Sequence, residues 1–136
     1  MNRPIEFRLL NENKKIVGYE KWHYGNFNME HKKDYYVSQP LWLYSTDREY
    51  WSPGNIEHRY KNQFTGLLDK NGNKIFESDL LKHPKQDELG LVYWDKISCS
   101  FKVKYDNDDN YALFLQINDK GLAIVVGNVF EHPNLI

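Results

Sequence analysis

Residues 90–105, GLVYWDKISCSFKVKY, decide the fold. An apolar run from Leu91 to Trp94 follows Gly90, and apolar or aromatic residues then alternate with lysines from Phe101 to Tyr105. Alternation with a period of two puts successive side chains on opposite faces of an extended chain, as in a half-buried β-strand. The stretch therefore predicts two strands that follow one another closely.

Further strands are expected on both sides of this stretch. Residues 74–82 (KIFESDLLK) predict a strand, or a strand with a turn. The alternation of Tyr111, Leu113, Leu115 and Ile117 predicts a strand rather than a helix. Residues 122–126 (LAIVV) are apolar throughout, as in a strand that is covered on both faces.

Two short segments that end in glycine predict tight turns. They are Asp69-Lys70-Asn71-Gly72 and Asn118-Asp119-Lys120-Gly121. A type I turn followed by glycine in the left-handed region is a common hairpin connection, so Gly72 and Gly121 are both expected at positive φ. Five short strands joined by such turns predict a small barrel, because closure removes exposed strand edges.

The N-terminal part of the chain is less regular. Residues 5–10 alternate, and residues 16–24 are β-prone but contain Gly18, which suggests a bulge. Pro40 interrupts an aromatic segment at 35–44 and favours an edge strand or an extended segment there. Residues 55–64 fit either a strand or a helix. We therefore expect a small irregular β region at 1–55 and a barrel at 56–136.

Composition limits the class of protein. Aromatic residues make up 15% of the 136 residues, which favours a packed fold over disorder. The single cysteine, Cys99, excludes an intrachain disulfide and a cysteine metal cluster. The formal charge of −1 lacks the basic excess of a dedicated duplex binder. No apolar stretch approaches a membrane span, and the N-terminus shows no signal peptide, so a cytoplasmic protein without membrane contact is expected.

An acidic pair, Glu77 and Asp79, leaves two interpretations open. Two residues apart on a strand, they would share a face and could act as general acid and base or bind a metal ion. Alternatively, their carboxylates accept backbone N–H groups in a turn. We favour the second interpretation, with Asp69, Gly72, Glu77 and Asp79 as structural turn residues. With no catalytic motif elsewhere, the sequence predicts a non-enzymatic protein without a cofactor or a metal ion.

A calcium-binding loop is not expected at the other acidic segment. Asp106, Asp108 and Asn110 have the spacing of the first three calcium ligands, but the glycine and glutamate that should follow are replaced by Tyr111 and Ile117. A solvated hairpin loop is the better interpretation.

Aromatic and basic residues are interleaved at two places. They are Trp22, Tyr24, His58, Arg59, Tyr60 and Lys61. Rings mixed with cationic donors are typical of single-strand nucleic-acid binders, and aromatic-lined grooves on small barrels also bind peptides. The same rings could simply pack in the core. These six residues form the candidate binding surface.

Three segments carry a family resemblance. Residues 63–80 (QFTGLLDKNGNKIFESDL), residues 126–133 (VGNVFEHP) and the opening Glu6-Phe7-Arg8 resemble the YopX-like family of phage and prophage proteins. The resemblance implies a mostly β protein whose C-terminal part is an SH3-like barrel, and it implies no reaction. Ser78 stands where the family usually has glycine, so a positive φ there would strain the backbone.

These observations predict a non-enzymatic phage or prophage accessory protein of the bacterial cytoplasm that acts through protein–protein contacts. Its partner is another protein or a second copy of the chain. The alternative is a nucleic-acid-binding module that uses the aromatic and basic surface of the barrel, with weak binding because of the charge balance. An enzyme centred on Glu77 and Asp79 is the third hypothesis.

Overall fold

The protein is mainly β and contains two five-stranded antiparallel sheets. The structure, a computed structural model, describes residues 5–24, 27–28, 36–37, 40–105, 110–117 and 122–133. Contacts divide the chain into two compact units, Met1–Gln63 and Phe64–Ile136. The predicted mainly β class is confirmed, whereas the domain boundary expected after residue 55 stays a prediction.

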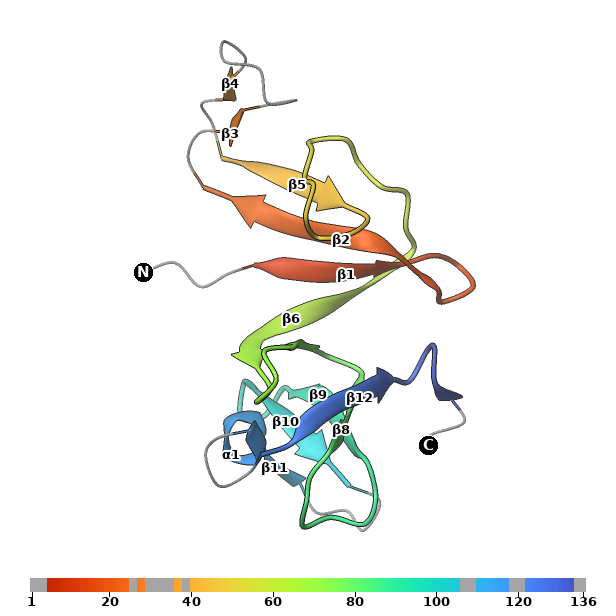
Figure 1. The fold of residues 1–136 in the computed structure, drawn as a ribbon, viewed down its shortest axis with the longest axis vertical. Coiled ribbons are helices and arrows are strands. Elements are labelled where there is room, and N and C mark those ends of the chain that lie inside the picture. The colour runs from red at the N-terminus through yellow and green to blue at the C-terminus, as the bar shows by residue number, and fades with distance from the viewer. Residues whose placement is uncertain are drawn as a thin grey trace. The chain divides into compact units, whose positions relative to one another are not determined.

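The first unit is built on antiparallel strands in the order β5-β2-β1-β6 (Figure 1). They are β1 (Glu6–Leu10), β2 (Ile16–His23), β5 (Leu41–Ser45) and the first residues of β6 (Tyr60–Leu68). A separate pair is formed by β3 (Phe27–Asn28) and β4 (Tyr36–Val37). The edge position of β5, directly after Pro40, confirms the expected edge strand. Residues 55–64 fitted either a strand or a helix in the sequence. From Tyr60 onward they form a strand, because β6 pairs with β1 there.

The bulge expected at Gly18 is also confirmed. Leu9 pairs with Gly18 but Leu10 pairs with Ile16, so the register shifts by one residue. A Cβ atom at position 18 would lie 2.7 Å from Ile56 Cδ1 and 2.9 Å from the Ser45 carbonyl oxygen. Glycine is required there because the chain passes too close for any side chain.

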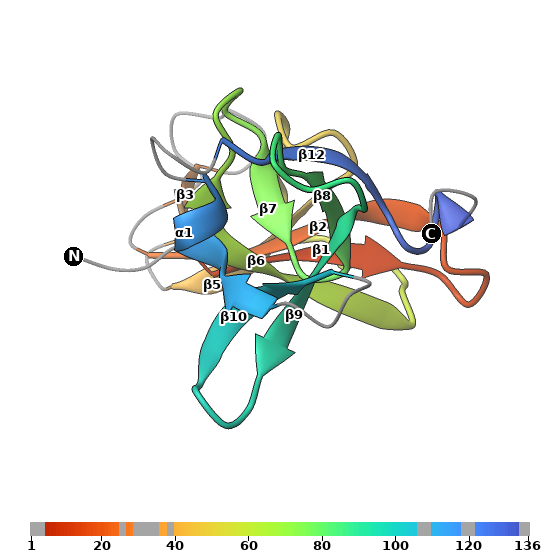
Figure 2. The ribbon, with the colours of Figure 1, turned by 90° about the horizontal axis from the view of Figure 1, so that it is seen from below.

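The second unit contains the remaining strands and one short helix (Figure 2). After β6 they are β7 (Lys74–Phe76), β8 (Asp79–Lys82), β9 (Gly90–Asp95), β10 (Ser100–Lys104), β11 (Asn110–Ala112), α1 (Leu113–Ile117) and β12 (Ile124–Asn128). The sheet order is β11-β10-β9-β8-β12. The deciding stretch, residues 90–105, forms the β9–β10 hairpin, with Val92 opposite Val103. Residues 74–82 form a strand, a bend and a second strand, and β12 begins two residues later than the apolar run at 122.

The strand expected from Tyr111 to Ile117 is wrong after Ala112, because residues 113–117 form α1. The segment ALFLQI is almost entirely apolar, so its pattern fits a period of two and a period of 3.6 equally well. Tertiary contacts decide: the Tyr105 hydroxyl donates to Gln116 Oε1 at 2.6 Å, and the Ala123 N–H donates to the Gln116 carbonyl at 2.7 Å. A helical turn places Leu113 and Gln116 together on the buried side.

The turn at residues 69–73 is organised by the buried carboxylate of Asp69. It accepts the backbone N–H groups of Asn71, Asn73 and Val125 at 2.9 Å each, and the Asn73 side-chain amide at 3.2 Å. Burial alone would raise the pKa of Asp69, but these donors outweigh it and hold the pKa below its ordinary value. Gly72 has a φ of 83°, as predicted, whereas Gly121 lies outside the described residues.

Ser78 occupies the left-handed region, with a φ of 72°, in the bend between β7 and β8. Its N–H donates to the Val92 carbonyl at 2.8 Å, and its carbonyl accepts the Val129 N–H at 3.1 Å. Both bonds fix the backbone, so the residue cannot relax to a negative φ without losing them. The strain expected at this position is therefore confirmed.

We predict that Asp69→Asn lowers the free energy of unfolding at pH 7 by roughly 1–3 kcal/mol, because an amide cannot accept all of these donors. The stabilisation by Asp69 is present above the pKa of the unfolded chain and is lost as the pH falls through the lower pKa of the folded state. Urea titrations of both proteins between pH 7 and pH 2 should show the difference shrinking in acid. A difference that stays constant with pH would contradict this assignment.

We also predict that Ser78→Gly stabilises the protein by about 1 kcal/mol, because glycine adopts a positive φ without strain. Thermal denaturation should show an increase of a few degrees in Tm. Ser78→Ala is the matched control, since it removes the hydroxyl but keeps the Cβ atom and hence the strain. Equal stabilisation by both substitutions would assign the effect to the hydroxyl instead.

Candidate binding surface

One face of the first sheet carries a cluster of aromatic side chains. Directly opposed residues of antiparallel strands share a face. Trp22 opposes Trp42, Glu20 opposes Tyr44, and Phe7 opposes Glu20. We call this the aromatic face and define it by Phe7, Glu20, Trp22, Tyr24, Trp42, Tyr44 and Lys61. The opposite side of the same strands is buried at Arg8, Leu43 and Asn62.

The rings of the aromatic face contact one another at steep angles. The Trp22 and Trp42 centroids are 5.1 Å apart with planes at 66°, and Trp22 meets Tyr24 at 6.1 Å and 86°. Phe7 lies 6.2 Å from Trp42. Edge-to-face pairs of this kind are the favourable arrangement for aromatic rings. Trp42 and Tyr24 remain 38% and 45% exposed, so the cluster is only partly withdrawn from solvent.

The buried carboxylate of Glu20 binds the two other polar groups of the aromatic face, the Lys61 ammonium and the Tyr44 hydroxyl. Glu20 accepts a hydrogen bond from Lys61 Nζ at 2.9 Å. The same ammonium lies 4.8 Å from the centroid of the Phe7 ring and 6.0 Å from that of Trp42, within the range of cation–π attraction. Burial, followed by the hydrogen bond to Glu20 and its charge, raises the pKa of Tyr44 to about 12. The aromatic face thus carries one negative and one positive charge, which neutralise each other.

The six predicted surface residues do not form one surface. Trp22 contacts Tyr24 directly on the aromatic face, and Lys61 belongs to the same cluster through Trp42, which both Lys61 and Trp22 contact. Tyr60 is 41% exposed and points to the other side of β6, because neighbours on a strand alternate. His58 and Arg59 line a separate pocket. All six residues belong to the first unit.

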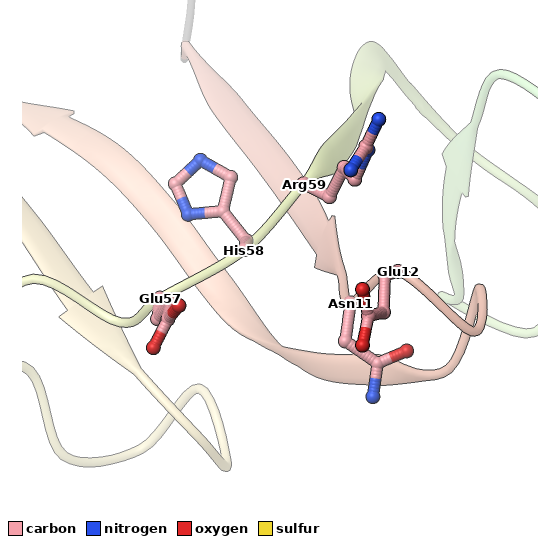
Figure 3. Close-up of a pocket in the computed structure, with 5 residues that line it drawn as sticks. All are labelled: Asn11, Glu12, Glu57, His58 and Arg59. Carbon is pink, nitrogen blue, oxygen red and sulfur yellow. The ribbon is translucent and has the colours of Figure 1, made fainter.

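The separate pocket is polar and open. It has a volume of about 650 Å³ and is lined by Asn11, Glu12, Glu57, His58 and Arg59. His58 Nδ1 lies 2.7 Å from the Ile56 carbonyl oxygen and donates a hydrogen bond to it, because a carbonyl oxygen only accepts. Figure 3 shows Glu57 and His58 leaving the chain on opposite sides. The polar groups do not converge on one point, as a catalytic centre would require.

The sequence pattern did not single out the other four residues of the aromatic face, which are Phe7, Glu20, Trp42 and Tyr44. The sequence did contain one indication of this face: Trp42 and Tyr44 are two residues apart in a β-prone segment, which puts both side chains on one side of a strand. Their association with Trp22 depends on the register of β2 with β5, and the sequence pattern did not provide that register.

The acidic pair at Glu77 and Asp79 lies in the bend between β7 and β8. Asp79 is 1% exposed, and its Oδ2 accepts the backbone N–H of Phe76 at 2.8 Å. Among the described residues, no three His, Cys, Asp or Glu side chains gather into a group that could hold a metal ion. The observed hydrogen bond is the one that a structural turn requires, so the structural interpretation of Asp79 is favoured. The calcium-like residues Asp106 and Asp108 lie outside the described residues.

The fold and the aromatic face describe a mainly β protein with a neutral, partly exposed aromatic surface. The chain matches the family model described as YopX protein over residues 6–136, and it therefore belongs to the YopX family. A search of curated proteins found no match. Within the described ranges, no helix has the length and apolar character needed to cross a membrane.

We predict that Asp79→Ala lowers the free energy of unfolding by roughly 1–2 kcal/mol, because the buried Phe76 N–H loses the carboxylate that accepts its hydrogen bond. Thermal denaturation with and without added Mg²⁺ or Mn²⁺ measures this, and the metals should not change the Tm of either protein. Asp87→Ala removes an exposed carboxylate and is the control, with an expected change within about 0.5 kcal/mol. A more stable Asp79→Ala variant, together with metal stabilisation of the wild type alone, would instead indicate a metal or catalytic site.

Proposed function

We propose that the protein is a non-enzymatic phage or prophage accessory protein of the bacterial cytoplasm, and that it binds a protein partner through the aromatic face. The observation that carries the proposal is the half-exposed ring cluster around Trp22 and Trp42. Tryptophan and tyrosine are enriched where protein interfaces bind most strongly, because they bury a large area with few rotatable bonds. The family resemblance implies no enzymatic reaction, which is compatible with a binding protein.

We further propose that the second unit is an SH3-like barrel, in agreement with the family resemblance. Three features support it. Strands β8 to β11 follow one another as antiparallel neighbours, the short helix α1 precedes the last strand, and β12 returns to pair with β8. In this proposal the second unit is a stable platform, since its core residues come from most of its strands.

Electrostatics favour a protein partner over nucleic acid. Affinity for nucleic acid rests on cations that are free to neutralise phosphates. Lys61 is instead held by Glu20 at 2.9 Å, and Arg59 shares its pocket with Glu12 and Glu57. The chain as a whole carries a charge of −1. The aromatic face therefore offers stacking surface without the positive field that a nucleic-acid strand requires.

The proposal predicts that a protein partner depends on Trp42. Tagged protein is purified from bacteria in which the phage or prophage is active, and copurifying proteins are identified by mass spectrometry. A stoichiometric partner should be captured by the wild type and lost with Trp42→Ala. The matched control is Trp94→Ala, which removes a tryptophan of similar exposure, 41%, from the second unit.

Two outcomes would contradict the proposal. One is a partner captured equally by the wild type and by Trp42→Ala. The other is submicromolar binding of a single-stranded oligonucleotide at physiological salt, measured by fluorescence anisotropy and lost in an Arg59→Ala, Lys61→Ala double variant. A dimer of the chain that requires Trp42 would support the proposal, with a second copy as the partner.

A further inference from the structure

We propose that the aromatic face recognises a proline-rich segment of its protein partner, bound in the polyproline II conformation. This inference rests on the proposed function and names the chemistry of the partner. It follows from the angles between the rings, the unused indole donors, the balanced charge and the blocked edge of β5.

The ring angles suit proline side chains. The Trp22 ring plane is inclined by 66° to that of Trp42 and by 86° to that of Tyr24, so neighbouring rings present a face beside an edge instead of one flat stack. Trp22 and Trp42 also sit opposite each other at a position where the two backbones do not exchange hydrogen bonds, since the neighbouring Tyr44 uses both of its backbone groups on Ser52. Side chains are closest together at such positions. Rigid, compact pyrrolidine rings pack against aromatic side chains in the proteins that bind proline-rich segments.

The indole nitrogens supply what a polyproline II helix needs. Such a helix has no internal hydrogen bonds, so its carbonyl groups accept hydrogen bonds from the protein that binds it. In the described part of the chain, neither the Trp22 nor the Trp42 indole N–H has a hydrogen-bond partner. By contrast, the indole of Trp51 donates to the Arg48 carbonyl at 3.1 Å. Two donors on one face are therefore available to a ligand that offers only acceptors.

Charge and backbone geometry argue against other ligands. The pairing of Lys61 with Glu20 leaves no net charge on the aromatic face, which matches an uncharged proline segment better than a phosphate backbone. Addition of a partner strand to the edge of β5 is also obstructed at Tyr44. The N–H and carbonyl groups of Tyr44 already bond to Ser52 at 2.7 and 3.0 Å. A ligand that binds the side-chain face, as polyproline II segments do, avoids this obstruction.

The test uses the full chain and a decaproline peptide. The peptide contains no tryptophan, so the intrinsic fluorescence of the protein reports binding. A flexible Gly-Ser peptide of the same length is the control ligand. We expect saturable binding of decaproline alone, weakened at least about tenfold by Trp42→Ala and unchanged by Trp94→Ala. Trp42→Phe keeps a ring but removes the N–H donor, and it should weaken binding less than Trp42→Ala.

The outcomes separate this inference from the proposed function. Absence of saturable decaproline binding, equal binding of the Gly-Ser peptide, or equal affinity of the wild type and both Trp42 variants would overturn the inference. If a partner captured from cells still depends on Trp42 in that case, the proposed function stands and only the proline chemistry is wrong. Should Trp42→Ala fail to fold, comparison of the wild type with Trp42→Phe decides the question.

Discussion

The second unit depends on the carboxylate of Asp69, which joins a local turn to a strand far away in the sequence. Through the Val125 N–H it connects the β6–β7 turn to β12. The two strands flanking the turn are joined by a second buried bond, from the Thr65 hydroxyl to the Ile75 carbonyl at 2.7 Å. Ile75 is fully buried in the core. The Asp69 side chain thus accepts the backbone N–H groups of its own turn and also one N–H of the edge strand β12. The turn that it holds leads directly into β7, which carries the core residue Ile75.

Local patterns predicted the parts of the fold that are determined locally. The β9–β10 hairpin follows from its apolar run and its alternation, and the 69–72 turn from its glycine, because both patterns lie within a few neighbouring residues. The bond from the Val125 N–H to Asp69, which joins the same turn to β12, could not be predicted from them. The strand expected at 113–117 was wrong because the apolar segment fits two periods, and the contacts of Gln116 with Tyr105 and Ala123 favour the helix. Residues 60–64 were ambiguous for the same reason, and their pairing with β1 decides their conformation.

The candidate surface was only partly predictable. The interleaved rings and cations singled out Trp22, Tyr24 and Lys61, which lie on the same face of the sheet, and their role in binding stays a prediction. His58 and Arg59 are close to Lys61 in the sequence but line a separate pocket, because neighbouring residues of a chain need not lie on the same face. Trp42 is twenty positions from Trp22 and meets it through strand register. That register depends on the whole sheet, including the bulge at Gly18.

The polar members of the aromatic face make this ring cluster different from a purely apolar exposed surface. A large, purely apolar exposed surface tends to associate without specificity. Here the charged Lys61 ammonium lies beside Phe7 and Trp42, and the four-carbon chain of a lysine can cover apolar area next to such rings. An unpaired Lys61 would be a mobile surface cation, but Glu20, itself buried, fixes its position. Glu20 in turn needs Lys61 and the Tyr44 hydroxyl, because a buried carboxylate without partners is costly. The pair therefore protects the aromatic face from non-specific association and leaves the indole groups of Trp22 and Trp42 available to a ligand.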